Sequence, residues 1–154
     1  MDLQELARIR ELLRSVPDPA AMLESIFAFA PLGLQVYGVD GQSLLVNRAF
    51  REMFASEPPP DYNVFKDEVV ARAGILPLIR RAFAGELIHI PAMWYDPREL
   101  EHVRVSEARR VGIETWIIPL LDAGQRVTHV ALVAKDVTSE MGAREGLRRE
   151  AEAR

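Results

Sequence analysis

The chain has 154 residues, of which 49% are hydrophobic and 27% charged, and its formal net charge is −4 at pH 7. This length suits one domain with terminal extensions, and the composition is ordinary for a soluble globular protein. The acidic balance argues against a nucleic-acid partner, because binding phosphates requires a basic face.

The sequence contains no cysteine, which excludes disulfides, thiolate metal ligands and thiol nucleophiles and fits a reducing cytoplasm. No apolar run approaches the ~18 residues that cross a bilayer, and the first residues do not resemble a signal peptide. We therefore expect a cytoplasmic domain whose own residues make no membrane contact. A longer parent protein can still be anchored elsewhere.

An amphipathic helix is predicted over residues 2–15. Its apolar side chains recur at helical spacing and form one stripe under a charged surface: Leu6, Ile9, Leu13 and Val16. The stripe can pack on the domain's own core or against a partner helix, which would give a homodimer. The sequence leaves both alternatives open.

A second helix is predicted from Pro19 to about Phe29. Val16-Pro17 ends the first helix, and Asp18 is suited to cap the second because its side chain can accept a backbone N–H bond. The segment Ala30-Pro31-Leu32-Gly33 should end this helix.

A strand is predicted over residues 34–39, and Asp40-Gly41 is a strong hairpin signal that leads into a returning strand over residues 42–46. Asn47 can cap a short helix after this hairpin. Its apolar face would carry Ala49, Phe50, Met53 and Phe54. Residues 56–63 contain three consecutive prolines and are expected to form a loop.

Another helix is predicted over residues 75–84, with Gly85 as its stop. Residues 86–90 predict a short strand. The following stretch, residues 91–97 (PAMWYDP), is expected to be irregular or bulged, because prolines interrupt strand pairing.

The last third of the chain predicts a long antiparallel hairpin. Residues 103–121 and 125–136 are rich in β-branched side chains and flank a turn at Asp122-Ala123-Gly124. A charged helix over residues 138–154 follows, with Asp136 or Thr138 as its cap. Local hairpins with helices segregated from them indicate an α+β fold.

The sequence contains several short segments in a particular order. They are Ser25-Ile26-Phe27, Ala30-Pro31-Leu32-Gly33, Val39-Asp40-Gly41, Val46-Asn47-Arg48-Ala49-Phe50, Ala82-Phe83-Ala84-Gly85-Glu86, Pro119-Leu120 and Asp136-Val137-Thr138. In this order, over roughly residues 23–140, the chain resembles the PAS domain family. The closing triplet looks like the Asp-Ile/Val-Thr with which many PAS domains join the last strand to an outgoing signalling helix.

The resemblance implies a PAS fold, a five-stranded antiparallel sheet cupping short helices, with a ligand cavity between them and flanking helices that often dimerise. The domain boundaries expected from it are an N-terminal amphipathic helix (1–18), a PAS domain (19–138) and a C-terminal signalling helix (139–154). It also implies a sensory domain of a bacterial two-component system that relays a signal to an effector, such as a histidine kinase, outside this chain. The alternative is a ligand-free dimerisation module whose cup is filled by its own side chains.

The ligand class is narrowed by what the sequence lacks. Without cysteine, the flavin photochemistry of light-sensing PAS relatives is excluded. Haem is disfavoured, because the helix over residues 75–84, which supplies the haem ligand in haem-binding relatives, contains no histidine; the histidines are His89, His102 and His129. No metal-ligand pair or catalytic motif is present, so we expect neither a metal site nor an enzyme.

The candidate cavity is assigned mainly to aromatic and apolar side chains, with Tyr62, Asn63 or Tyr95 as hydrogen-bonding partners of a small apolar ligand. Plain core packing of the same residues is the alternative. Asp136, Val137 and Thr138 are predicted to relay the signal. The predicted cavity residues are Val36, Phe50, Phe54, Tyr62, Asn63, Phe65, Ile79, Phe83, Met93, Trp94, Trp116, Val130 and Leu132.

Overall fold

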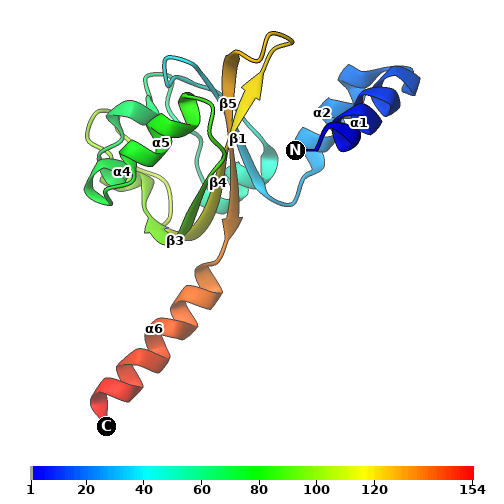
Figure 1. Ribbon diagram of the computed structural model, residues 1–154. Helices are drawn as coiled ribbons and strands as arrows, with labels where there is room; N and C mark the ends of the chain where they lie inside the picture. Colours follow the sequence, from blue (N-terminus) through cyan, green and yellow to red (C-terminus); the bar gives the residue numbers. More distant parts are fainter. Residues whose placement is uncertain (1) are drawn as a thin grey trace.

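The centre of the molecule is a five-stranded antiparallel sheet with the strand order β2-β1-β5-β4-β3 (Figure 1). The computed structural model describes residues 2–154. The strands are β1 (Gly33–Gly38), β2 (Ser43–Val46), β3 (Ile88–Tyr95), β4 (Val111–Leu121) and β5 (Val127–Asp136). This confirms the predicted α+β architecture and its five-stranded sheet.

Short helices cover one face of this sheet, the inner face of the cup. They are α3 (Arg48–Phe54), the 3-10 turn η1 (Val64–Lys66), α4 (Glu68–Arg72) and α5 (Leu76–Phe83). The predicted helices after Asn47 and before Gly85 are confirmed as α3 and α5. The five-residue α4 was not predicted, because one turn and a half shows no apolar periodicity.

Two clusters of buried side chains join the helices to the sheet. One lies under α4 and α5 and includes Ile117 and Val130, and the other surrounds α3 and includes Phe54 and Val111. Leu132 packs against both clusters. Burying an aliphatic side chain of this size contributes roughly 2 kcal/mol.

The β1–β2 turn depends on Gly41, whose φ of +86° is a conformation that side-chain-bearing residues rarely adopt. A Cβ there would lie 2.5 Å from both Asn63 Oδ1 and Phe65 Cδ2. The Val64 N–H also donates to the Gly41 carbonyl oxygen at 3.0 Å. The turn therefore clamps the segment that leads into η1 and α4.

Strand β3 continues past the expected boundary. The predicted strand over residues 86–90 starts two residues later and runs through Pro91 to Tyr95. The expected bulge is present, because the register with β4 shifts between Ile90 and Met93. Since β3 is an edge strand, the missing N–H of Pro91 can face away from the ladder.

Strand β4 begins later than predicted, at Val111 instead of Val103. Residues 103–110 form a loop after the 3-10 turn η2 (Pro97–Glu99), and Val103 is buried in the core despite its irregular backbone. Pro119 is accommodated within β4 because it lies beyond Ile117, the last β4 residue that pairs with β3.

The terminal helices stand apart from the sheet (Figure 1). Helices α1 (Leu3–Ser15) and α2 (Pro19–Phe29) lie next to each other, and α6 (Thr138–Ala153) runs away from the cup. Asp18 caps α2 as predicted, accepting from the Ala21 N–H at 3.0 Å. The residues of α1, all of which the structure describes, include no buried side chain, so its stripe is not docked on the core. None of the helices within residues 2–154 is long and apolar enough to cross a membrane.

Candidate functional site

A cavity of about 80 Å³ lies between the inner face of the sheet and the helices that cover it. Such a volume holds on the order of five water molecules, so it suits a small ligand better than a flavin or a porphyrin. Most of the lining is apolar and comes from both core clusters. The polar side chains that reach it from the sheet, from the loop before η1 and from the N-cap of α4 are Gln35, Tyr37, Tyr62, Asp67, Tyr95 and Thr115.

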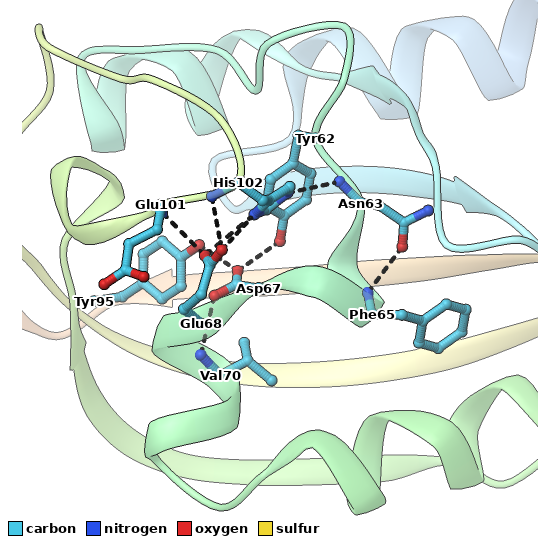
Figure 2. Close-up of polar contacts among 9 residues, drawn as sticks. All are labelled: Tyr62, Asn63, Phe65, Asp67, Glu68, Val70, Tyr95, Glu101 and His102. Atoms are coloured by element: carbon cyan, nitrogen blue, oxygen red, sulfur yellow. Dashed lines mark hydrogen bonds and ion pairs between the residues drawn. The ribbon is translucent and has the colours of Figure 1, made fainter.

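Asp67 is the centre of the polar part of the lining and is only 1% exposed (Figure 2). Its Oδ2 accepts from the Tyr62 hydroxyl at 2.7 Å and from the Tyr95 hydroxyl at 2.5 Å. Its Oδ1 accepts from the Val70 N–H at 3.0 Å and thereby caps α4. Burial, reinforced by neighbouring polar groups, raises the pKa of Tyr62 and of Tyr95 well above the usual value, so both hydroxyls remain donors.

A second set of hydrogen bonds links polar side chains of β1 and β2 beside the cavity. The Tyr37 hydroxyl donates to Gln35 Oε1 at 2.7 Å, and Gln35 Nε2 donates to the Ser43 hydroxyl at 2.9 Å. Gln35 and Tyr37 are 3% and 2% exposed, so these bonds compensate for the loss of water. Burial also raises the pKa of Tyr37, which keeps its proton.

The loop after η2 is fastened to α4 by Glu68 and His102 (Figure 2). Glu68 accepts from the backbone N–H groups of Glu101 and His102 at 3.1 and 2.7 Å, and its two oxygens lie 3.1 Å from His102 Nδ1. The Asn63 N–H donates to His102 Nε2 at 3.2 Å, so this ring nitrogen acts as an acceptor and Nδ1 faces Glu68. The clamp holds one wall of the cavity.

Replacing Glu68 with glutamine should flatten the acid limb of the stability curve. Burial alone would raise the pKa of Glu68, but the hydrogen bonds from Glu101 and His102 outweigh it and lower the pKa from 4.5 to about 2. A depressed carboxyl pKa stabilises the fold fully above pH 4.5, and this contribution is lost as the pH falls toward 2. Urea unfolding across that window should therefore show a smaller pH dependence in Glu68→Gln. The exposed control Glu150→Gln should keep the wild-type slope, and equal slopes in all three proteins would contradict this role.

Six of the thirteen predicted cavity residues line the cavity. They come from α3, the loop before η1, α5, β3 and β5: Phe50, Phe54, Tyr62, Ile79, Met93 and Leu132. Binding of a ligand by these residues remains a prediction. The other seven lie elsewhere.

Four of those seven are on the cup side but away from the cavity. Val130 is fully buried in the core. Phe65 and Phe83 pack on each other at 4.7 Å between ring centroids, and the Arg80 guanidinium lies 5.0 Å over the Phe65 ring. Asn63 instead shapes the chain: it accepts from the Phe65 N–H and donates to the Asp40 carbonyl oxygen.

The remaining three predicted cavity residues face the outer side of the sheet. In β1 the buried positions are Gln35 and Tyr37, so Val36 between them faces the outer side of the sheet. Trp116 pairs with His89 on that outer side, at 5.1 Å between ring centroids. Trp94 also faces outward, and assigning these three residues to the cavity was wrong.

Strand β3 connects the cavity to the outgoing helix. Met93 and Tyr95 line the cavity, whereas the intervening Trp94 donates from Nε1 to Glu145 Oε1 on α6 at 2.7 Å. The Arg110 guanidinium lies 3.9 Å over the Trp94 ring. Neighbouring side chains of β3 thus reach the cavity and α6.

The junction between β5 and α6 is tied to β4 at Gly112. The Val137 N–H donates to the Gly112 carbonyl oxygen at 2.8 Å, and the Gly112 N–H donates to Thr138 Oγ1 at 3.0 Å. Asp136 Oδ1 accepts from the N–H and the hydroxyl of Thr138. The predicted cap of this helix, Asp136 or Thr138, was wrong. Val137 occupies the N-cap position of α6. The three predicted relay residues form the joint itself.

None of the three histidines lines the cavity, so the part of the chain that the structure describes places no imidazole where haem would need an axial ligand. Nor does residue range 2–154 contain a group of three or more His, Asp or Glu side chains placed to hold a metal ion.

The sequence matches no protein-family model and no curated protein. Similar solved structures exist. An RNA-binding light-oxygen-voltage receptor aligns over 91% of this chain and 40% of its own, with 19% identity and a TM-score of 0.66. The PAS domain of an HTR-like protein from Haloarcula marismortui aligns over 88% and 100%, with 14% identity and a TM-score of 0.55. A domain of a sensory box sensor histidine kinase/response regulator from Geobacter sulfurreducens aligns over 76% and 93%, with 14% identity and a TM-score of 0.54.

Proposed function

We propose, from the PAS fold that these likenesses establish, that the chain is a sensory domain that binds a small non-covalent ligand in its cavity. The ligand shifts β3 and β4, and the shift is relayed through the β5–α6 joint to an effector outside this chain, such as a histidine kinase. A ligand can do this only if it binds two packings of the domain with different affinity.

The observation that supports this proposal is the alternation of side chains along two neighbouring strands. In β3, Met93 and Tyr95 face the cavity and Trp94 contacts α6. In β4, Ile113 lines the cavity, and the adjacent Gly112 bonds to the start of α6. Successive residues of a strand face opposite sides, so each strand contacts both the ligand space and the output helix.

The test is whether the cavity side of β3 affects α6 through Trp94. Tyr95→Phe removes a hydroxyl that reaches Asp67 and touches no part of α6 that the structure describes. We expect it to change amide hydrogen exchange in α6 of the wild-type background and to have no effect in a Trp94→Phe background. Trp94→Phe by itself removes the bond to Glu145 and should speed α6 exchange about fivefold, because a hydrogen bond contributes about 1 kcal/mol.

The matched control is Trp116→Phe, which alters another tryptophan on the same outer face but not the contact with α6. It should leave α6 exchange unchanged and preserve the effect of Tyr95→Phe. If Tyr95→Phe changes amide hydrogen exchange in α6 by the same amount in the wild-type and Trp94→Phe backgrounds, the proposed route through Trp94 is contradicted.

The second candidate function is a homodimerisation module. Helices α1 and α2 expose large apolar side chains that the described chain leaves uncovered: Leu3, Ile9, Leu12, Leu13, Leu23, Ile26 and Phe29. Large apolar side chains exposed on two neighbouring helices are typical of association sites, and a second copy of the chain presents the same side chains. Sedimentation equilibrium tests this, and a monomer across the whole concentration range would contradict it.

A further inference from the structure

The ionisable side chains that line the cavity include carboxylates but no basic groups. Within residues 2–154 the lining contains two carboxylates, Asp67 and Glu57, but no Lys, Arg or His. Glu57 is exposed and lies 3.5 Å from Arg51 Nε. Asp67 is 1% exposed and forms no ion pair with any described residue. A buried carboxylate is costly unless it is paired or fully hydrogen-bonded.

The hydrogen bonds to Asp67 leave room for one more donor. An ionised carboxylate has about four acceptor positions. Tyr62, Tyr95 and the Val70 N–H occupy three of them, two on Oδ2 and one on Oδ1. One acceptor position, on Oδ1, is therefore not used by any hydrogen bond from the described residues.

The tyrosines around Asp67 also present acceptors to a ligand. Tyr62 and Tyr95 give their hydroxyl protons to Asp67, and Tyr37 gives its proton to Gln35. Each of these oxygens consequently offers only lone pairs to the cavity. A ligand that donates several hydrogen bonds fits this lining, whereas a carboxylate or phosphate would face the acceptor oxygens of Asp67 and the tyrosines and few free donors.

Aromatic rings complete the environment. Phe50 and Phe54 lie 4.8 Å apart between ring centroids, and Phe54 meets Tyr95 edge to face at 5.7 Å. These three rings and those of Tyr37 and Tyr62 all line the cavity. Aromatic faces attract cations, and the attraction grows when the cation is removed from water.

We infer that the cavity binds a small organic cation, a primary or methylated alkylammonium, with its charged head at Asp67 and its alkyl part among the aromatic and aliphatic side chains. This inference rests on the proposed function, because it names the ligand class of the proposed sensory cavity. The volume of about 80 Å³ limits the ligand to a few heavy atoms.

The experiment titrates the wild-type chain with three probes of nearly equal size: n-butylammonium, 1-butanol and butyrate. Binding is followed by the amide NMR shifts of residues that line the cavity. We expect n-butylammonium to bind at least about tenfold more tightly than 1-butanol, because it adds a charge-assisted hydrogen bond. Butyrate should produce no shifts at the cavity.

Two variants locate the charge that is responsible. Asp67→Asn should weaken n-butylammonium binding at least about tenfold and leave 1-butanol binding within about twofold. Glu150→Gln, which alters an exposed carboxylate outside the lining, should change neither. If Asp67→Asn fails to fold, which NMR dispersion and thermal unfolding reveal, the three wild-type titrations decide the question.

The outcomes separate this inference from the proposed function. Equal or tighter binding of 1-butanol or butyrate would overturn the cation assignment and leave a ligand-binding sensory domain. Absence of cavity shifts with every probe would also overturn it. The Tyr95→Phe exchange experiment would then decide independently whether the cavity communicates with α6.

Discussion

Replacing Asn47 with alanine is expected to lower the free energy of unfolding by about 3 kcal/mol, because it leaves several buried backbone groups without partners. Asn47 is 2% exposed. Its Oδ1 accepts from the N–H groups of Leu34 and Phe50 at 2.9 and 3.0 Å, and its Nδ2 donates to the carbonyl oxygens of Phe27 and Leu32, both at 3.0 Å. One side chain thus joins the end of α2, the linker, β1 and the start of α3.

The matched control for Asn47→Ala is Asp18→Ala, because Asp18 also caps a helix but is exposed and makes one such bond. Loss of an exposed cap should cost about 1 kcal/mol or less. Urea unfolding measures both, and the slope against denaturant shows whether the folded state stays compact. Similar costs for the two variants would show that Asn47 is only a helix cap. In that case the N-terminal helices would be attached by some other contact.

Local signals were sufficient for most of the fold. The Asp40-Gly41 turn, the Asn47 cap and the Asp18-Pro19 helix start each depend on neighbouring residues, and each appears as predicted. The predictions were wrong where contacts between residues far apart in the sequence determine the structure. Residues 103–110 begin with the alternating Val103-Arg104-Val105, which is typical of a strand, but they have no partner strand, since β3 pairs with β4 only from Val111 onward.

The candidate site was harder to predict because a strand has two faces. Periodicity of two shows which residues share a face but not which face is the inner one. Met93 and Trp94 were both assigned to the cavity, although neighbouring strand residues face opposite sides; the structure places Met93 and Tyr95 in the lining and Trp94 outside it. A bulge inserts an extra residue into one strand and so changes which of the following residues face the inner side. The position of a bulge depends on the partner strand and cannot be read from the local sequence pattern.

Asp67, the central polar residue of the cavity, was also missed. In the sequence it is one acidic residue beside Glu68, and its role appears only when Tyr62 and Tyr95, 5 and 28 residues away, converge on it. The available signal was an aspartate followed by Glu68-Val69-Val70, which fits a helix cap before an apolar turn. That signal predicts a helix start, not a binding site.

Replacing Gly112 with alanine is expected to displace α6 and to lower the free energy of unfolding by about 2 kcal/mol, a typical cost of overpacking. The added Cβ would lie 2.6 Å from Met141 Sδ and 3.2 Å from Thr138 Cα. The methionine can swing away, but Thr138 is held in place, because its hydroxyl accepts from the Gly112 N–H and its own N–H donates to Asp136 Oδ1. Amide hydrogen exchange should therefore become faster in the first turns of α6, while the core strands lose only the global 2 kcal/mol.

A second substitution, Met141→Ala, separates the two contacts of that Cβ. It removes the sulfur, so the double variant Gly112→Ala/Met141→Ala should regain part of the lost protection, with a coupling of at least about 0.5 kcal/mol between the two sites. The contact with the Thr138 backbone remains, so the recovery should be incomplete. Wild-type exchange of α6 in Gly112→Ala would mean that the helix is not held at this joint. The output would then have to leave the domain by Trp94 and Glu145 alone.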